Sequence, residues 1–404
     1  MTTTPDHRGP RRRAFAALLA AGAVVGGLAW SAPAAGAQGP AQPGPTAVVA
    51  PAARPAPPDR ALQAALDGLV ADHGFPGALA TVVDARGRER DYTAGVGDLA
   101  TGRRVPPDGQ VRIGSNSKTF TASVVLQLVA EGKVALDEPV ETYLPGVVRG
   151  EGIDPTAITV RNLLQHTSGL AEYLLGMGLG NPPDFFSVRD RYWQPRDLVD
   201  LSLAQGADFQ PGERWAYSNT NYILAGLIVE RVTGRPLAEQ ITERIIEPLG
   251  LRDTYVPLPG ERDLRGRHPQ GYHPLPDGTM GDITRLDPSM GGAAGDIVST
   301  PSDLNRFFSA IVAGEVVPPA QLAEMQSTVP MPEEYPGDGY GLGLISTELS
   351  CGVVAWGHGG DIPGFSSRGG AVADGRAATV VTTSLVPSTE ALAAAEQAVD
   401  VALC

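Results

Sequence analysis

The sequence predicts a mixed α/β fold of the α+β kind, in which one antiparallel sheet is built from both ends of the chain and flanked by helices. β-Branched runs separated by glycine-rich turns occur near both termini, whereas the middle of the chain shows mainly helical periodicity. Internal repeats and a regular strand–helix alternation are both missing, which argues against a parallel doubly wound sheet. The middle is therefore expected to be a helical insertion into the sheet.

The first 37 residues have the parts of an export signal. Four arginines between positions 8 and 13 precede an apolar stretch over residues 15–30, and small residues at 35–37 offer a cleavage site. Arg12 and Arg13 also resemble a twin-arginine signal, which would imply export after folding. Because the apolar stretch is short for a membrane span, we expect a secreted, extracellular protein without a stable membrane anchor.

Residues 38–59 are rich in proline and alanine and are predicted to be a disordered spacer before a domain over residues 60–404. Removal of residues 1–37, with four arginines and one aspartate, would take the net charge from −14 to −17. Such a charge favours solubility and argues against a nucleic-acid or anionic-membrane partner.

The expected elements follow the apolar periodicity of each segment in chain order. Helices are expected over residues 60–73, from Ser115 to Gly132, over 159–164, from Asn219 to Gly234, over 241–249 with a break near Pro248, over 302–313, and after a Ser388 cap. Strands are expected over residues 78–84 and 90–96, joined as a hairpin, and over 353–356, 367–372 and 378–385. Residues 257–292 are expected to be a long loop with weak strands.

Ser115 and Lys118 stand three residues apart at the head of an apolar helical run, so they would share one helix face. A neutral lysine amine there could take the serine proton and make the hydroxyl a nucleophile. The chain has two lysines, Lys118 and Lys133, against 29 arginines, and a guanidinium cannot be deprotonated in a protein. The alternative is a capping serine with a surface lysine, and these residues alone leave both interpretations open.

Two further patterns could belong to an active site. Tyr217 and Asn219 precede a helix and would point the same way in an extended backbone, one to relay a proton and the other to hold an amide carbonyl. The glycines of His358-Gly359-Gly360 would let a substrate backbone approach a strand edge. Taken singly, each pattern is more typical of a structural role.

Other chemistries find less support. His166 and Ser168 are two residues apart in a polar turn, which is a poor spacing for a catalytic pair, and they are predicted to be structural. His268 and His273 lack a third ligand at zinc spacing. No Gly-x-Ser-x-Gly elbow, phosphate loop or dinucleotide fingerprint occurs. We therefore expect no metal and no organic cofactor.

The three motifs around Ser115, Tyr217 and His358 occur in the order and spacing of penicillin-recognising serine enzymes. Residues 60–404 resemble the class C β-lactamase and DD-peptidase group, most closely the secreted actinobacterial serine D-alanyl-D-alanine carboxypeptidases. Further matching segments are Tyr143-Leu144-Pro145-Gly146, Tyr340-Gly341-Leu342-Gly343-Leu344 and Leu349-Ser350-Cys351-Gly352. The resemblance implies a β-lactamase/transpeptidase-like fold.

The resemblance also implies a covalent acyl-enzyme mechanism. Ser115 would attack a peptide or lactam carbonyl while Lys118 and Tyr217 share the proton transfers. The backbone N–H groups of Ser115 and Asp361 would form the oxyanion hole. The implied substrate-binding residues are Asn219, His358, Gly359, Gly360 and Asp361.

Cys351 and Cys404 form an even pair in an exported chain, which most simply indicates a disulfide. In the group that the chain resembles, a terminal cysteine pairs with the cysteine after Leu-Ser. Such a bond would be worth roughly 4 kcal/mol in the chain-entropy model.

The sequence departs from those carboxypeptidases where they bind a free C-terminal carboxylate. Their two threonines and one arginine are replaced here by Gly359, Asp361 and Ile345, so this carboxylate clamp is expected to be absent. The sequence still predicts a monomeric serine hydrolase of the DD-carboxypeptidase type, which takes small peptides and is acylated by penicillins. The alternatives are an esterase, a D-aminopeptidase-like hydrolase or a weak β-lactamase with the same serine, and a slow penicillin-binding module.

Overall fold

The computed structural model describes residues 58–404, with the exception of 182, 333–334 and 336. The predicted export signal and nearly all of the predicted spacer lie outside these residues. The first helix, α1 (Pro58–Ala71), begins two residues before the predicted domain boundary.

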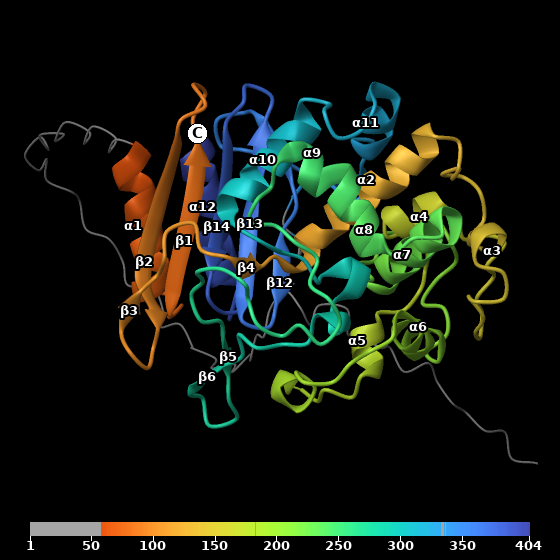
Figure 1. Ribbon diagram of the computed structural model, residues 1–404, viewed down its shortest axis with the longest axis horizontal. Helices are drawn as coiled ribbons and strands as arrows, with labels where there is room; N and C mark the ends of the chain where they lie inside the picture. Colours follow the sequence, from red (N-terminus) through yellow and green to blue (C-terminus); the bar gives the residue numbers. More distant parts are fainter. Residues whose placement is uncertain (1–57, 182, 333–334, 336) are drawn as a thin grey trace, which may run out of the picture.

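Within the described residues, one ten-stranded antiparallel sheet has the order β3-β2-β1-β14-β13-β11-β10-β9-β8, with β12 paired to β13. The strands are β1 (Gly77–Val83), β2 (Glu89–Asp98), β3 (Arg103–Arg104), β8 (Val329–Pro330), β9 (Gly339–Tyr340), β10 (Ile345–Glu348), β11 (Val354–Gly357), β12 (Gly360–Ile362), β13 (Phe365–Val372) and β14 (Ala377–Thr382). β1 lies between β2 and β14, with Ala78 opposite Thr382 (Figure 1). The prediction of a sheet built from both ends of the chain is confirmed.

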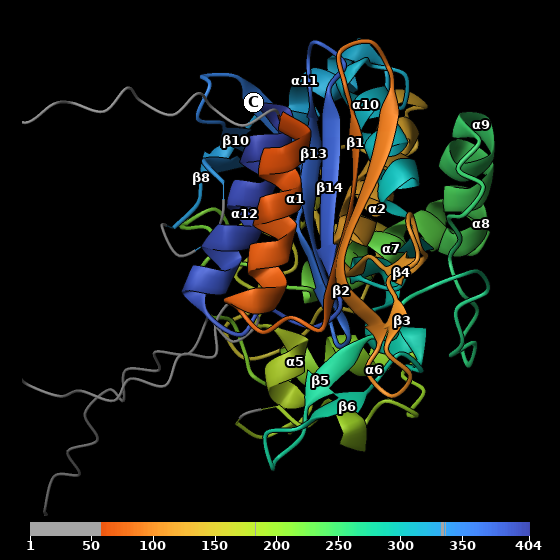
Figure 2. The same cartoon turned by 90° about the vertical axis from the view of Figure 1, so that its left-hand side faces the viewer.

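Two helices cover one face of the sheet, α1 and the C-terminal α12 (Thr389–Leu403), as Figure 2 shows. Their apolar stripes pack with β-strand residues in one buried cluster, which includes Leu66, Ala395 and Val380. Ser388 caps α12 as predicted, because its side chain accepts a hydrogen bond from the N–H of Ala391.

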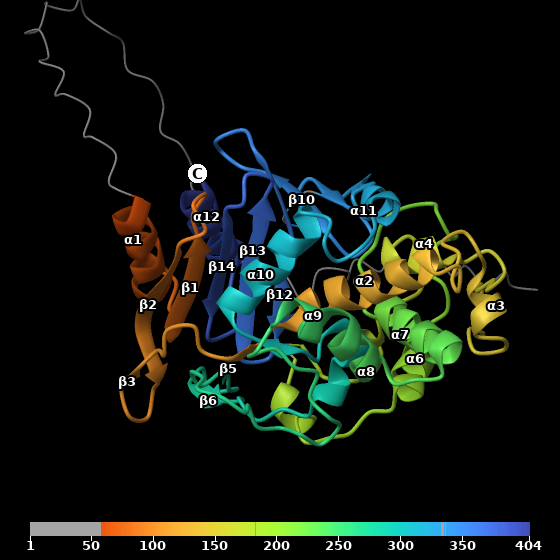
Figure 3. The same ribbon diagram turned by 45° about the horizontal axis from the view of Figure 1, so that its top comes forward.

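The other face packs against α10 (Pro301–Val312), beyond which the helical region extends (Figure 3). This region holds α2 (Ser117–Ala130), α3 (Val140–Tyr143), α4 (Val160–Leu164), α5 (Tyr173–Gly176), α6 (Pro195–Leu203), α7 (Thr220–Thr233), α8 (Leu237–Ile241), α9 (Glu247–Leu249) and α11 (Pro319–Met325). Two short ribbons pair β4 (Val111–Arg112) with β7 (Val298–Ser299), and β5 (Tyr272–Pro274) with β6 (Met280–Asp282). α2 is apolar and buried almost all round, which is typical of a central helix.

One helix prediction is wrong. The segment predicted over 241–249 begins at Leu237, and Pro248 does not break it. Instead a π-helical turn over Thr242–Ile246 joins α8 to α9, with the N–H of Glu247 bonded to the carbonyl of Thr242. The segment is therefore one continuous run of helical turns from Leu237 to Leu249, with Pro248 in its last turn.

Candidate active site

Ser115 lies in a 3₁₀ turn, Gly114–Asn116, directly before α2. The backbone of β12 packs against this turn so closely that side chains would not fit. A Cβ at Gly114 would stand 2.8 Å from the carbonyl oxygen of Asp361, and one at Gly360 would stand 1.9 Å from that of Ile113. Glycine is needed on both sides of the contact, which brings Ser115 beside the backbone of Asp361.

Lys118 lies in the first turn of α2 and is fully buried. Its Nζ donates to Ser115 Oγ at 3.0 Å, to Asn219 Oδ1 at 2.6 Å and to the Ala294 carbonyl at 2.9 Å. Burial lowers the pKa of Lys118 to about 7, against the opposing attraction of Glu172 and Asp361. A large fraction of this amine is therefore neutral near pH 7, the form that can accept a proton from Ser115.

Asn219 connects this lysine to a carboxylate. Both the backbone N–H and the side-chain Nδ2 of Asn219 donate to Glu172 Oε2, at 2.7 and 2.9 Å. Glu172 Oε1 accepts the N–H of Leu174 at 3.1 Å. Burial raises the pKa of Glu172, and the bonds from Asn219 oppose the rise. The sequence analysis missed Glu172, because a single acidic residue after a helical segment has no recognisable motif.

Tyr217 is the third member of the group around the serine. The Nζ of Lys118 lies 4.8 Å from the centre of its ring. Burial raises the pKa of the Tyr217 phenol well above its usual value, while a hydrogen bond with Ser115 works in the other direction. The phenol therefore keeps its proton at neutral pH and can donate it only within a concerted transfer.

A cavity of about 400 Å³ opens onto these groups. Ser115, Glu172, Tyr217 and Asn219 line it, and Lys118 stands behind them. Much of the remaining wall is apolar and aromatic: Leu170, Leu174, Leu175, Leu179, Phe185, Trp215, Met331 and Tyr335. The pocket has the character of a small-molecule site with a few polar groups at one end.

His358 and Gly359 of the predicted His358-Gly359-Gly360 segment are among the residues that line the cavity. His358 is buried, and its Nε2 lies 3.0 Å from the hydroxyl of Tyr340. His166 lies on the other side of the same hydroxyl, at 3.1 Å. His166 and Ser168 do not form a pair with each other, since Ser168 donates to Asn221 Oδ1, and their predicted structural role is confirmed.

Asp361 lines the pocket, and its carboxylate has hydrogen-bond partners within the protein. Arg368 reaches both of its carboxylate oxygens, at 3.2 and 3.0 Å, and Ser366 donates to it at 2.6 Å. Arg368 is buried and also lies 3.5 Å from Glu396 of α12. One arginine thus stands between two carboxyl groups, and burial raises the pKa of the second of them, Glu396. Ile345, at the position of the expected clamp arginine, lines the same cavity.

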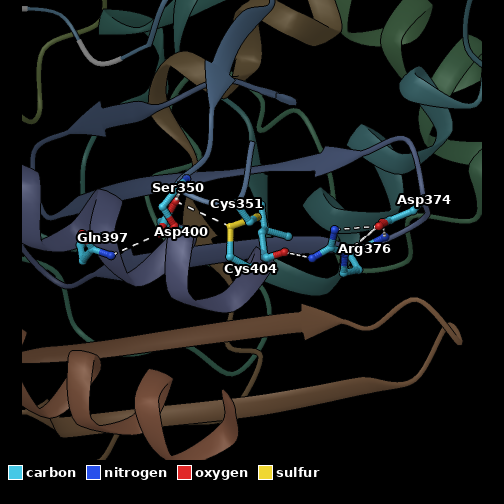
Figure 4. Close-up of a disulfide and its surroundings, with 8 residues drawn as sticks. Ser350, Cys351, Asp374, Arg376, Gln397, Asp400 and Cys404 are labelled. Carbon is cyan, nitrogen blue, oxygen red and sulfur yellow. Dashed lines mark hydrogen bonds and ion pairs between the residues drawn. A yellow bond between two sulfur atoms is a disulfide. The ribbon is translucent and has the colours of Figure 1, made fainter. Parts of the chain in front are cut away.

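Cys351 and Cys404 are joined by a disulfide, with Cα atoms 5.7 Å apart (Figure 4). The bond ties the end of α12 to the turn before β11. Beside it, Ser350 donates from its N–H and its hydroxyl to Asp400, and Arg376 donates to the carbonyl of Leu403. Because α12 contributes Glu396 to the pocket, this end of the helix helps to fix the pocket wall.

The part of the chain that the structure describes contains no cluster of three or more histidine, cysteine or acidic residues able to hold a metal ion. Over the same residues, no helix is both long enough and apolar enough to span a bilayer.

Comparison with known proteins identifies the family. The family model "Beta-lactamase" matches residues 62–403. A D-stereospecific amidohydrolase from Streptomyces sp. has a similar structure, with a TM-score of 0.75 and 41% identity over 83% of this chain and 98% of that chain. Esterase EstB of Burkholderia gladioli is 32% identical over 339 residues, 73% of this chain and 84% of the esterase. Penicillin-binding protein 4 of Amycolatopsis lactamdurans is 30% identical over 322 residues, 76% of this chain and 78% of that protein. The chain therefore belongs to the β-lactamase family and is a serine hydrolase.

Proposed function

We propose that this hydrolase cleaves amides or esters of D-amino acids whose α-amino group is free and whose side chain is apolar. The observation that carries the proposal is Glu172, a carboxylate in the pocket wall that is linked through Asn219 to the Lys118–Ser115 pair. An ammonium group beside the scissile carbonyl would find a carboxyl acceptor there, and its positive charge would favour the ionised form of Glu172. The apolar wall around Leu174 and Phe185 suits the side chain of such a residue.

The proposed reaction passes through an acyl-enzyme. Ser115 Oγ attacks the carbonyl carbon as its proton passes to Lys118, and the backbone N–H groups of Ser115 and Asp361 hold the oxyanion. As the C–N or C–O bond breaks, Tyr217 gives its proton to the leaving amine or alcohol and regains one from Lys118 in the same concerted transfer, which leaves Lys118 neutral. Water then attacks the ester on Ser115 by the reverse proton path and releases the free acid.

The pocket supports this substrate class over a C-terminal dipeptide. Where the carboxypeptidases have an arginine and threonines, this chain has Ile345, Gly359 and an Asp361 already held by Arg368. Because Arg368 is already bonded to Asp361 and also lies 3.5 Å from Glu396, it is not free to bind a carboxylate on the leaving group. The name of the Streptomyces relative, a D-stereospecific amidohydrolase, agrees with the D configuration. The D-aminopeptidase-like alternative thus ranks above the DD-carboxypeptidase predicted first.

A substrate panel tests the proposal. Purified protein is offered D-phenylalanine amide, its L enantiomer, its N-acetyl derivative, an N-blocked peptide ending in D-Ala-D-Ala, and p-nitrophenyl acetate. Cleavage of the free D-amide, lost in Ser115→Ala, is expected. Glu172→Gln should lower kcat/KM for the free amide by roughly 10–100-fold more than for p-nitrophenyl acetate, the worth of one charge-assisted hydrogen bond to the ammonium group. Glu138→Gln, outside the pocket, is the matched control.

Each alternative gives a different result in the same panel. Faster cleavage of the D-Ala-D-Ala peptide would favour a carboxypeptidase, and cleavage of p-nitrophenyl acetate alone would favour an esterase. A stable adduct with a fluorescent penicillin, without turnover of any substrate, would identify a binding module. Equal rates of cleavage for the free and the N-acetylated amide would contradict the proposed role of Glu172.

A further inference from the structure

A chain of hydrogen bonds connects the loop before α7, which carries Tyr217 and Ser218 and is called the tyrosine loop below, with the start of β12, the strand beside Ser115. His166 Nδ1 lies 3.2 Å from the backbone nitrogen of Ser218, and its Nε2 lies 3.1 Å from Tyr340 Oη. Tyr340 Oη lies 3.0 Å from His358 Nε2, and His358 Nδ1 lies 2.5 Å from the carbonyl oxygen of Gly359. All these side chains are buried.

The two ends of the chain fix the position of every proton in it. The N–H of Ser218 can only donate, so His166 Nδ1 is an acceptor and its Nε2 carries the proton toward Tyr340. The carbonyl of Gly359 can only accept, so His358 Nδ1 carries the proton and Nε2 accepts from Tyr340. The Tyr340 hydroxyl therefore receives a hydrogen bond from His166 Nε2, and its own proton faces two acceptors, His358 Nε2 and the Tyr222 oxygen.

The surroundings keep both rings neutral. Burial and the nearby Lys118 hold the pKa of His166 well below its usual value and lower that of His358 to about 3. Burial raises the pKa of Tyr340 well above the usual value for tyrosine. Tyr222 also lies within hydrogen-bonding reach of Tyr340, but its own hydroxyl donates to the Leu164 carbonyl at 2.7 Å.

Both ends of the chain lie next to the proposed catalytic groups. Ser218 directly follows Tyr217, and the His166 ring packs against the Tyr217 ring with 4.3 Å between centroids. At the other end, Gly359 directly precedes Gly360, whose backbone packs on the turn that holds Ser115. The tyrosine loop and the β12 edge come from distant parts of the sequence, and Tyr340 on β9 is the link between them.

We propose that Tyr340 is a positioning residue, whose hydroxyl fixes the distance between Tyr217 and the β12 edge through His166 and His358. The proposal rests on the roles given above to Ser115 and Tyr217, but not on the identity of the substrate. Loss of the hydroxyl removes the hydrogen-bond partner of His358 Nε2, so the tyrosine loop and β12 can move relative to each other. Because the hydroxyl does not touch the pocket's amine-binding group Glu172, substrate binding should change less than turnover.

Kinetics of Tyr340→Phe in the full chain test the proposal, with both the D-amide and p-nitrophenyl acetate as substrates. We expect kcat to fall about 10–100-fold on either substrate, since small misplacements of catalytic groups have effects of this size, while KM stays within about twofold. Tyr143→Phe is the matched control, because this tyrosine also holds a backbone N–H through its hydroxyl, at 2.8 Å from Ala135, outside the pocket. Wild-type kcat in Tyr340→Phe, or an equal loss in Tyr143→Phe, overturns the proposal.

Nitrogen NMR of the histidine-labelled wild-type protein gives a second readout that does not depend on turnover or on a folded variant. The expected tautomers are Nε2–H for His166 and Nδ1–H for His358, assigned with single His→Gln variants, and both rings should remain neutral at pH 6. Either opposite tautomer, or a protonated ring at that pH, overturns the proposal. If wild-type protein cleaves neither substrate, the proposed function is wrong. The histidine tautomers still test whether the hydrogen bonds from Ser218 to Gly359 are present.

Discussion

Lys118 and Lys133 show how the position of an amine decides its chemistry. Lys118 is fully buried beside Ser115, whereas the side chain of Lys133 is 50% exposed and pairs with Glu131. Desolvation disfavours the ammonium form of Lys118. The use of lysine at position 118 in an arginine-rich chain is therefore explained by the need for an amine that can lose its proton.

Lys118→Arg should nearly abolish activity, because a guanidinium cannot serve as the base. Loss of general-base catalysis typically costs about 10²–10⁴ in rate, and kcat/KM on the D-amide should fall by that amount. Lys133→Arg makes the same change on the surface and should leave kcat/KM unaltered. An active Lys118→Arg variant would contradict the role given to Lys118.

The pH dependence of acylation should follow the same amine. Since the pKa of Lys118 is lowered to about 7, the neutral base is populated above pH 7 and lost below it. The pre-steady-state acylation rate should fall roughly tenfold per pH unit on the acid side, to about 1% of its plateau at pH 5. A rate that stays constant from pH 5 to 8 would show that another group accepts the proton.

At the scale of elements, the position of the 3₁₀ turn Gly114–Asn116 relative to β12 depends on one close backbone contact. Gly360→Ala would place a Cβ 1.9 Å from the Ile113 carbonyl oxygen, where neither backbone can move freely. Overpacking of this kind typically costs about 1–3 kcal/mol, so we expect a lower Tm and a displaced Ser115 with reduced kcat. Gly68→Ala in α1, where the nearest atom would be 3.5 Å away, should be neutral or stabilising. Differential scanning calorimetry of the two variants makes the comparison.

The disulfide should stabilise the attachment of α12 to the sheet. The bond closes a loop across 53 residues, for which the chain-entropy model gives about 4 kcal/mol. Cys351→Ser combined with Cys404→Ser should therefore lower the free energy of unfolding in urea by a few kcal/mol. Addition of a reductant should destabilise the wild type but not the double variant. Equal stability of the two proteins under oxidising conditions would contradict this role.

Elements with strong periodicity were predicted within a few residues, as α7 and α12 illustrate. The short strands β8 and β9, of two residues each, were not predicted, because so few residues cannot show a period. The π-helical turn before Pro248 was also not predicted, because such turns are rare.

At the scale of the whole molecule, the net charge of −14 should act on substrates before they bind. A cationic D-amide is attracted by the protein and by the acidic pocket, and dissolved salt screens this attraction. Its kcat/KM should fall several-fold between about 0.01 M and 1 M salt, across which the Debye length falls from roughly 30 Å to 3 Å. The neutral p-nitrophenyl acetate is the control, and an equal salt effect on both substrates would contradict electrostatic attraction.

The sequence by itself determined the fold class, the family and the residues around Ser115, because the motifs at 115–118, 217–219 and 358–360 keep fixed local spacing and order. Only the tertiary structure brought Glu172, Tyr340 and Arg368 to the same pocket. Glu172 and Tyr340 contact partners far away in the sequence, Asn219 for Glu172 and His166 for Tyr340, and these contacts leave no local pattern. The proposed nucleophile could therefore be predicted from neighbours along the chain, whereas the groups that surround the proposed substrate depend on how distant segments pack.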